Sequence, residues 1–485
     1  MSNDRIEPAS YIRLVVVAAL SLGFMARAAT YQSPLFDFHS WRQADTATIS
    51  RNFAREYFNP LYPQIDARGA LPNGFVETGF EIHAFAVAIL SKAVGFSPQL
   101  GRLLNAALFP IAALLLFRFV RTRYGDDVAL VALCIYALGL PLSLYMDRAF
   151  MNEAILTLLS VVCLRTAQQY CAGAGGGYLA ALVLASATIA IVKPTYLLVY
   201  APVFGLFWER FGAAALARWE LWLSALVSAA CGVLWFSHAH ALAQATGLSF
   251  GLGDKLVNTD ILLSAEYWIK IVRRLFADIL GPVGFVAALA GVIIALRRRR
   301  VAELLAFLAF DIYLFVVVGG NFHHNYYQLP IVPVATVLIA LAIVETASRV
   351  AQRRGWRRDQ MVTLCAGIVW LAMMSAFARS VSAHNWYELD ARRVTLCEDV
   401  RPHLSETDRV VFVNDRSPDV LFCLDRKGWL LNEHEGNMDS LRRLAAQGGS
   451  IVIVRASHPV RGELDAAATR LLESTEYVVY RMKAE

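Results

Sequence analysis

The chain has 485 residues, of which 57% are hydrophobic and only 17% are charged. A mean hydropathy of +0.48 excludes an ordinary soluble enzyme and indicates a membrane protein. The formal net charge of +6 does not indicate nucleic-acid binding, because the basic residues gather in short loops between apolar runs. There they indicate which loops face the cytoplasm.

The apolar runs predict an all-α polytopic protein with about 11 transmembrane helices. The predicted spans are 11–30, 101–120, 127–145, 154–171, 178–193, 195–209, 219–238, 279–296, 303–318, 329–346 and 361–380. Segment 79–96 is also apolar, but as a further span it would place three basic clusters outside. As an interfacial helix it leaves all three in the cytoplasm. We therefore predict a bacterial inner-membrane protein with a cytoplasmic N-terminus and an extracytoplasmic C-terminus.

The composition changes after residue 380, which separates a transmembrane module (1–380, with a first external loop over 31–100) from a small α/β domain (381–485). In the tail we predict strands at 409–414, 450–455 and 477–481, and helices at 438–446 and 462–474. Cys397 and Cys423 are the only cysteines of the tail. An oxidising compartment allows them to pair, but the sequence leaves their pairing open.

The first loop carries a dense polar stretch that includes Asp37, His39, Trp41, Arg42 and Asp45. Ionisable groups at a membrane surface are costly unless they meet a charged substrate or one another. Asp45 precedes a helical pattern over 46–58, so it is either the helix cap, a general base, or both. Asp37 competes for the base role. The aromatic residues of the stretch are either substrate contacts or interfacial anchors.

Three further outward-facing segments carry polar residues. Asp147 and Arg148, with Glu153, form either a local ion pair or a second polar cluster. Lys193 either reaches up to the headgroups or binds a lipid phosphate.

The third segment holds His323, His324, Tyr326 and Tyr327, which favour phosphate or sugar contact. Adjacent histidines point in different directions on most backbones, so no metal ligand set is predicted. A divalent metal cofactor is left open.

Several motifs together resemble those of the GT-C membrane glycosyltransferases, in particular the bacterial aminoarabinose-transferase and protein-mannosyltransferase branch. The resemblance covers roughly residues 10–346. It rests on His39-Ser40-Trp41-Arg42-Gln43-Ala44-Asp45-Thr46 with Ile49-Ser50-Arg51-Asn52-Phe53, on Glu77-Thr78-Gly79-Phe80, and on the segment from His324 to Pro333. The Lys-Pro-Pro motif of the aminoarabinose enzymes is replaced here by Glu77-Thr78-Gly79, so a donor phosphate is left to Lys193 or an arginine.

The resemblance implies an inverting transfer of a sugar from a polyprenyl-phosphate donor to a hydroxyl of a glycolipid, glycan or protein at the outer membrane face. Asp45 or Asp37 would then be the base, and the other outward-facing residues would bind substrate. No nucleotide is implied. Two other classes are a lipid-linked sugar flippase and a non-catalytic assembly protein. A flippase predicts charges deep within spans, of which Asp311 is the main example.

Overall fold

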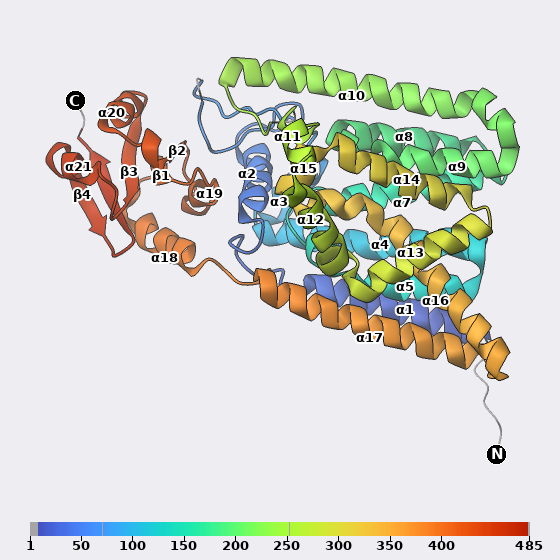
Figure 1. Ribbon diagram of the computed structural model, residues 1–485. Coiled ribbons are helices and arrows are strands. Elements are labelled where there is room, and N and C mark those ends of the chain that lie inside the picture. Colours follow the sequence, from blue (N-terminus) through green and yellow to red (C-terminus); the bar gives the residue numbers. More distant parts are fainter. Residues whose placement is uncertain (1–7, 70, 252, 484–485) are drawn as a thin grey trace. The chain divides into compact units, whose positions relative to one another are not determined.

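The computed structural model describes residues 8–69, 71–251 and 253–483, and the chain divides into two compact units (Figure 1). The helical unit comprises Met1–Tyr31, Arg102–Phe236 and Gly251–His384. The mixed unit comprises Gln32–Gly101, Ser237–Phe250 and Asn385–Glu485. The predicted fold class, a polytopic helical protein with a small C-terminal α/β sheet, is confirmed. The proposed division at residue 380 stays a prediction.

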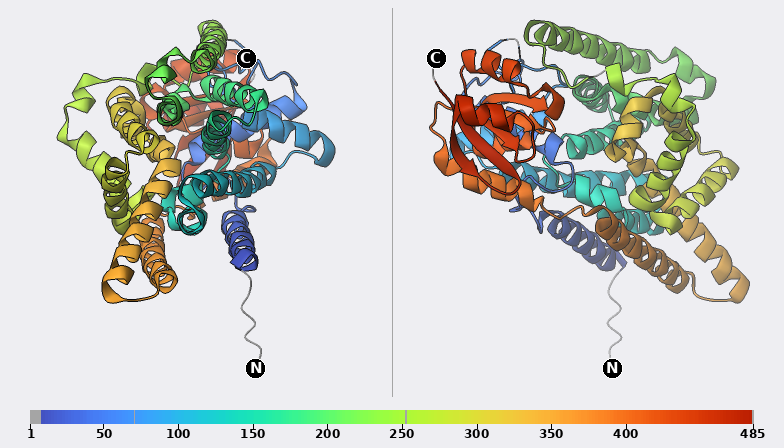
Figure 2. Two further views of the ribbon diagram at one scale, coloured as in Figure 1. Left: turned by 90° about the vertical axis from the view of Figure 1, so that its right-hand side faces the viewer. Right: turned by 60° about the vertical axis from the view of Figure 1, so that its left-hand side comes forward.

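Long helices joined by short turns make up the helical unit, with α16 packed against α5, α13 and α17, and α9 against α7 and α14. Figure 2 shows these helices from two further sides. Their bounds are α1 (Pro8–Ala28), α4 (Pro98–Tyr124), α5 (Asp126–Cys134), α6 (Pro141–Met146), α7 (Glu153–Cys171), α8 (Gly176–Val192), α9 (Tyr200–Phe211), α10 (Trp219–Thr246), α11 (Thr259–Leu262), α12 (Ala265–Arg273), α13 (Gly281–Arg297), α14 (Val301–Val316), α15 (Val318–His323), α16 (Val332–Arg354) and α17 (Arg358–His384).

Within the described residues, six helices are long and apolar enough to cross a membrane. A seventh span results if α12 and α13, with the π-helical turn Arg274–Ile279 between them, count as one element bent by 103°. The chain is therefore an integral membrane protein, while the number of eleven spans stays a prediction. The predicted span 127–145 is broken into α5, a π-turn and α6, because Pro141 has no amide hydrogen to continue the helix.

The mixed unit contains the first loop, in which α2 (Ser40–Arg55) packs against α3 (Ile82–Val94). Ile49 and Phe53 of α2 meet Ala84 and Ala88 of α3 in a buried cluster. With 13 residues, α3 is shorter than the roughly 20 residues of a spanning helix. This length suits the interfacial helix predicted for 79–96.

The tail forms a five-stranded sheet in the order β2-β1-β3-β5-β4. The strands are β1 (Arg409–Asn414), β2 (Gly428–Asn432), β3 (Gly449–Arg455), β4 (Ala468–Glu473) and β5 (Tyr477–Met482). β1 pairs in parallel with β2 and β3, and β5 pairs antiparallel with β3 and β4. One face is covered by α18 (Ala391–Val400) and α19 (Asp419–Leu424), the other by α20 (Met438–Ala446) and α21 (Arg461–Ala467).

Two features of the tail differ from the prediction or complete it. The predicted helix 462–474 is wrong in its second half: the chain leaves α21 and continues as β4, an edge strand whose helix-compatible residues are held by pairing with β5. β2, the other edge strand, pairs with β1 and was not predicted. Cys397 of α18 and Cys423 of α19 form a disulfide, with their Cα atoms 6.0 Å apart.

Candidate active site

The helix that carries the polar stretch of the first loop starts earlier than the sequence predicted. α2 begins at Ser40, after His39 adopts a left-handed conformation with φ of 61°, so Asp45 lies in its second turn. The alternative in which Asp45 caps a helix starting at Thr46 is therefore wrong, whereas its role as a base stays open. Residues 43–53 of α2 are all buried, and tertiary packing of this kind stabilises a helix that its own polar sequence would not.

Asp45 is 3% exposed and sits among charged neighbours. Burial raises the pKa of Asp45 to about 7; Arg42 opposes the rise, while Glu81 and Asp66 add to it. Arg42 in turn donates to Glu81 at 2.9 Å, and its guanidinium lies 4.7 Å from the centroid of the Phe250 ring. A carboxyl with a pKa near 7 has the proton affinity of an efficient general base.

Asp37 is held differently. The side-chain amide of Gln43 donates to Asp37 at 2.7 Å and to the carbonyl of Phe38 at 2.9 Å, so one turn of α2 fixes the carboxyl group. Two other predicted residues of the polar stretch, Trp41 and His39, differ in their surroundings. The Trp41 side chain is exposed, whereas the ring of His39 packs on Phe38 with the ring centroids 4.0 Å apart. The first loop therefore offers two buried carboxyl groups as bases, oriented by different partners.

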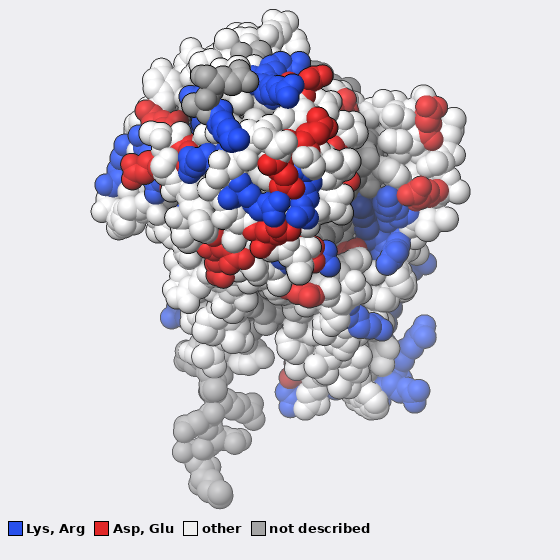
Figure 3. All heavy atoms as spheres, turned by 90° about the vertical axis from the view of Figure 1, so that its left-hand side faces the viewer, with Lys and Arg blue, Asp and Glu red and all other residues white. Residues whose placement is uncertain are grey.

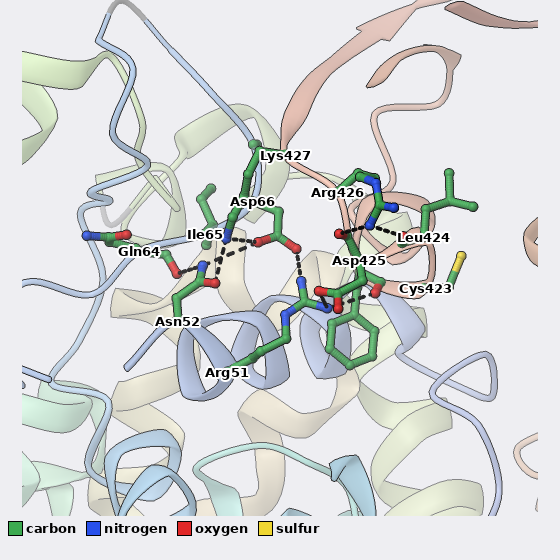
Figure 4. A network of polar contacts seen from close by, with 12 residues as sticks. Arg51, Asn52, Gln64, Ile65, Asp66, Cys423, Leu424, Asp425, Arg426 and Lys427 are labelled. Atoms are coloured by element: carbon green, nitrogen blue, oxygen red, sulfur yellow. Dashed lines mark hydrogen bonds and ion pairs between the residues drawn. The ribbon is translucent and has the colours of Figure 1, made fainter. Parts of the chain in front are cut away.

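A buried ion network that the sequence did not reveal holds α2 against the tail (Figure 4). Asp66 contacts Arg51 of α2 and accepts from Lys427 at 2.7 Å. We call Arg51, Asp66 and Lys427 the clasp. Burial alone would raise the pKa of Asp66, but Arg51 and Lys427 lower it below its ordinary value. Asp66 therefore stays ionised inside the clasp.

The backbone reinforces the clasp. The amide of Gly428 donates to the carbonyl of Asp66 at 3.1 Å, and the amide of Arg68 donates to the carbonyl of Gly428 at 2.7 Å. Gly428 begins β2, an edge strand of the sheet. The first loop therefore covers part of an otherwise open sheet edge, which ties the position of α2 to the α/β domain.

Two of the predicted residues of the helical unit, Lys193 and Asp147, each form an ion pair. Lys193 donates to Glu153 at 3.0 Å, and its ammonium lies 3.9 Å from the ring centroid of Tyr327 and 4.8 Å from that of Tyr326.

Asp147 binds Arg27 of α1 at 2.9 Å, a partner that the sequence did not indicate, and both side chains are buried. The guanidinium of Arg148 lies 4.5 Å from the ring centroid of Tyr145.

His323 stands in a cationic environment that sequence reasoning missed. Burial lowers the pKa of His323, and Lys255, Lys270 and Arg274 lower it further by electrostatic repulsion. Arg274 donates to the carbonyl of Asn321 at 2.6 Å, and the ammonium of Lys270 lies 3.7 Å from the Phe322 ring centroid. The residues that follow are aromatic and stacked: His324 lies on Tyr326 with centroids 5.0 Å apart. We call the three cations near His323, which are Lys255, Lys270 and Arg274, the cationic cluster.

Metal binding has no candidate in this arrangement. Over residues 8–69, 71–251 and 253–483, no group of three or more His, Cys, Asp and Glu side chains converges in a way that would hold an ion. We therefore assign no residues to a divalent metal and derive no step through one.

Neither the profiles of known protein families nor curated protein sequences match this chain. Solved structures do match it. The crystal structure of ArnT from Cupriavidus metallidurans bound to undecaprenyl phosphate superimposes with a TM-score of 0.66, covering 98% of both chains at 13% identity. The chain has the GT-C fold.

A second GT-C structure, the archaeal oligosaccharyltransferase AglB from Archaeoglobus fulgidus in complex with an inhibitory peptide and a dolichol-phosphate, gives a TM-score of 0.59. That match has 12% identity and covers 98% of this chain and 74% of AglB. The fold expected from the first-loop motifs is thereby confirmed, whereas the residues of the site are not tested by these matches.

Proposed function

We propose that the protein is a GT-C glycosyltransferase that moves a sugar from a polyprenyl-phosphate donor to a hydroxyl acceptor at the outer face of the membrane. The observation that carries the proposal is the match over 98% of both chains to a structure that holds undecaprenyl phosphate. That ligand has the chemistry of the proposed donor carrier. The second support is a buried carboxyl group with a pKa of about 7 in the first loop.

Asp45 is the proposed base. The acceptor oxygen attacks the anomeric carbon of the donor, the bond from that carbon to the phosphate oxygen breaks, and the phosphate leaves with the electron pair. Asp45 takes the acceptor's proton as the new bond forms. This single displacement inverts the anomeric carbon. Asp37 is the second candidate for the same role, since Gln43 holds it buried and oriented.

The cationic cluster is the proposed site of the donor phosphate. A leaving phosphate gains negative charge in the transition state, and prearranged cations stabilise that charge. Two of the lysines already have carboxylate partners, Lys193 with Glu153 at 3.0 Å and Lys270 with Glu266 at 3.2 Å. Arg274 is therefore the proposed main phosphate ligand. We assign Lys193 and the rings of Tyr326 and Tyr327 to the surrounding sugar and headgroup contacts.

The outward orientation of the tail is supported by its disulfide. Structural disulfides form and persist in oxidising compartments and are rare in the cytosol. The bond between Cys397 and Cys423 therefore favours an extracytoplasmic α/β domain, and with it an outer-face reaction.

A flippase is less supported, because Asp311 shares a helix face with Leu308 and Phe315, both of which are exposed on α14. That face does not line a path through the helical unit.

The proposal is tested by incubating purified protein with synthetic polyprenyl-phosphate sugars and membrane-extract acceptors. Wild-type protein should transfer sugar, and Asp45→Asn should abolish transfer. Asp439→Asn, at an exposed position of α20, is the matched control and should remain active. Absence of transfer by the wild type across a broad donor panel would overturn the proposal.

A further inference from the structure

A polar cleft of about 230 Å³ lies within the mixed unit, beside the clasp. One wall is α2, and the other consists of the segments that lead into β1 and β2. Its lining residues are Arg51, Asn52, Arg55, Glu56, Glu406, Thr407, Asp408, Arg409, Asp425, Arg426 and Lys427. None of these side chains is aliphatic or aromatic, and every one of them carries a polar or charged group. The cleft suits a hydrophilic ligand.

The charges of the cleft are not fully compensated. Three of its four carboxylates form ion pairs: Asp425 with Arg51 and Arg55, Glu56 with Lys427, and Asp408 with Arg481. Arg409 and Arg426 donate to main-chain carbonyls. Within the described part of the chain, neither guanidinium has a carboxylate at ion-pairing distance. Figure 3 shows how closely basic and acidic side chains are interleaved on the surface turned to the viewer.

We propose that this cleft binds an anionic group, a phosphate or a carboxylate, on a saccharide acceptor. A guanidinium presents several N–H donors in a planar fork that matches the oxygens of either anion. Arg409 and Arg426 supply this recognition. The designation of the ligand as an acceptor rests on the proposed function, whereas the binding of an anionic sugar does not.

The position of the cleft connects ligand binding to the candidate base. Arg51 and Asn52 line the cleft and belong to the same helix as Asp45, two turns away along α2. Figure 4 shows Arg51 and Asn52 on α2 facing Asp66 and Lys427, with Arg426 on the side of the tail. A ligand held between α2 and the tail therefore contacts the same helix that carries Asp45.

Binding is tested directly on the purified full-length protein at fixed ionic strength, by calorimetry and by the shift in melting temperature. The probes are glucose 6-phosphate, glucuronate and glucose. We expect at least one anionic sugar to bind and glucose not to bind, and the preferred anion identifies phosphate or carboxylate as the ligand group. The double variant Arg409→Gln/Arg426→Gln should lose at least tenfold in affinity, since each charged hydrogen bond is worth about a factor of ten.

Two further variants keep the result interpretable. Arg416→Gln changes an arginine of the same domain that is paired with Glu435 outside the cleft, and it should bind like the wild type. Glu406→Gln removes a carboxylate from the lining and should strengthen binding. Equal binding of glucose, or undiminished binding by the double variant, would overturn the inference.

The outcomes separate this inference from the proposed function. A protein that transfers sugar but binds none of the anionic probes overturns the cleft site and leaves the glycosyltransferase assignment intact. A protein that binds an anionic sugar through Arg409 and Arg426 but transfers nothing overturns the assignment and leaves the cleft site.

Discussion

Replacing Asp45 by asparagine should make the protein more stable and inactive at once. Burial raises the pKa of Asp45 from 3.8 to about 7, so the folded protein holds the neutral form more tightly than the unfolded chain does. The stability that Asp45 contributes therefore falls as the pH rises from about 4 to about 7, and it is constant above that range. Asparagine has nearly the same shape and no charge, so the variant avoids this loss.

The magnitude follows from the two pKa values. The difference between 3.8 and about 7 corresponds to at most about 4 kcal/mol of unfolding free energy at alkaline pH, since a pKa difference of one is about 1.4 kcal/mol. Between pH 5 and pH 8 the stability advantage of Asp45→Asn over the wild type should grow by about 2 to 3 kcal/mol. The advantage appears as a widening gap between the two melting temperatures.

The wild-type enzyme gives the second half of this test. If Asp45 is the base, transfer requires its ionised form, and kcat/KM should rise about tenfold between pH 6 and pH 8 for a pKa of about 7. A variant that is more stable yet inactive cannot owe its inactivity to misfolding. The reasoning is refuted if Asp45→Asn retains transfer, or if the melting temperatures of the two proteins change in parallel with pH.

Three other perturbations give sharp expectations. Lys427→Met leaves the buried clasp with one cation fewer and should lower the unfolding free energy by about 2 kcal/mol, read by chemical denaturation. Arg274→Gln should raise the donor KM at least tenfold, whereas Lys193→Met should raise it less, because its partner already neutralises that lysine. Cys397→Ser with Cys423→Ser should cost about 3 to 4 kcal/mol, because the disulfide closes a loop across a sequence separation of 26 residues.

Each of these expectations has a contrary result. If Lys427→Met has the same unfolding free energy as the wild type, the clasp does not hold α2. A larger effect of Lys193 than of Arg274 would move the donor phosphate away from the cationic cluster. Equal melting temperatures with and without reductant would show that the disulfide does not stabilise the tail.

The clasp should also respond to acid with the opposite sign to Asp45. The pKa of Asp66 is lowered in the folded protein, so its stabilising contribution is present above its ordinary pKa near 4 and is lost as the pH falls through the folded value. Denaturation curves at decreasing pH should therefore show a steeper loss of stability for wild type than for Asp66→Asn. Parallel curves would contradict a lowered pKa.

The fold class and several elements of the tail could be predicted from the amino-acid sequence alone. Apolar runs about as long as a bilayer is thick favour spanning helices, since backbone polar groups in hydrocarbon must be paired within the segment. Predicted strands at 409–414, 450–455 and 477–481 became β1, β3 and β5, because central strands read as short, strongly apolar runs. The two edge strands lack that pattern and were missed.

The partners of the charged residues, in contrast, could not be predicted without the three-dimensional structure. Asp66 and Lys427 are 361 residues apart in the sequence, and Arg27 finds Asp147 across 120 residues. The raised pKa of Asp45 comes from burial and from partners on other segments. Local patterns reflect hydrophobic burial and backbone geometry, which act over a few residues. Ion pairs and proton affinities depend on which distant side chains the folded chain brings within a few ångströms, in surroundings of low polarity.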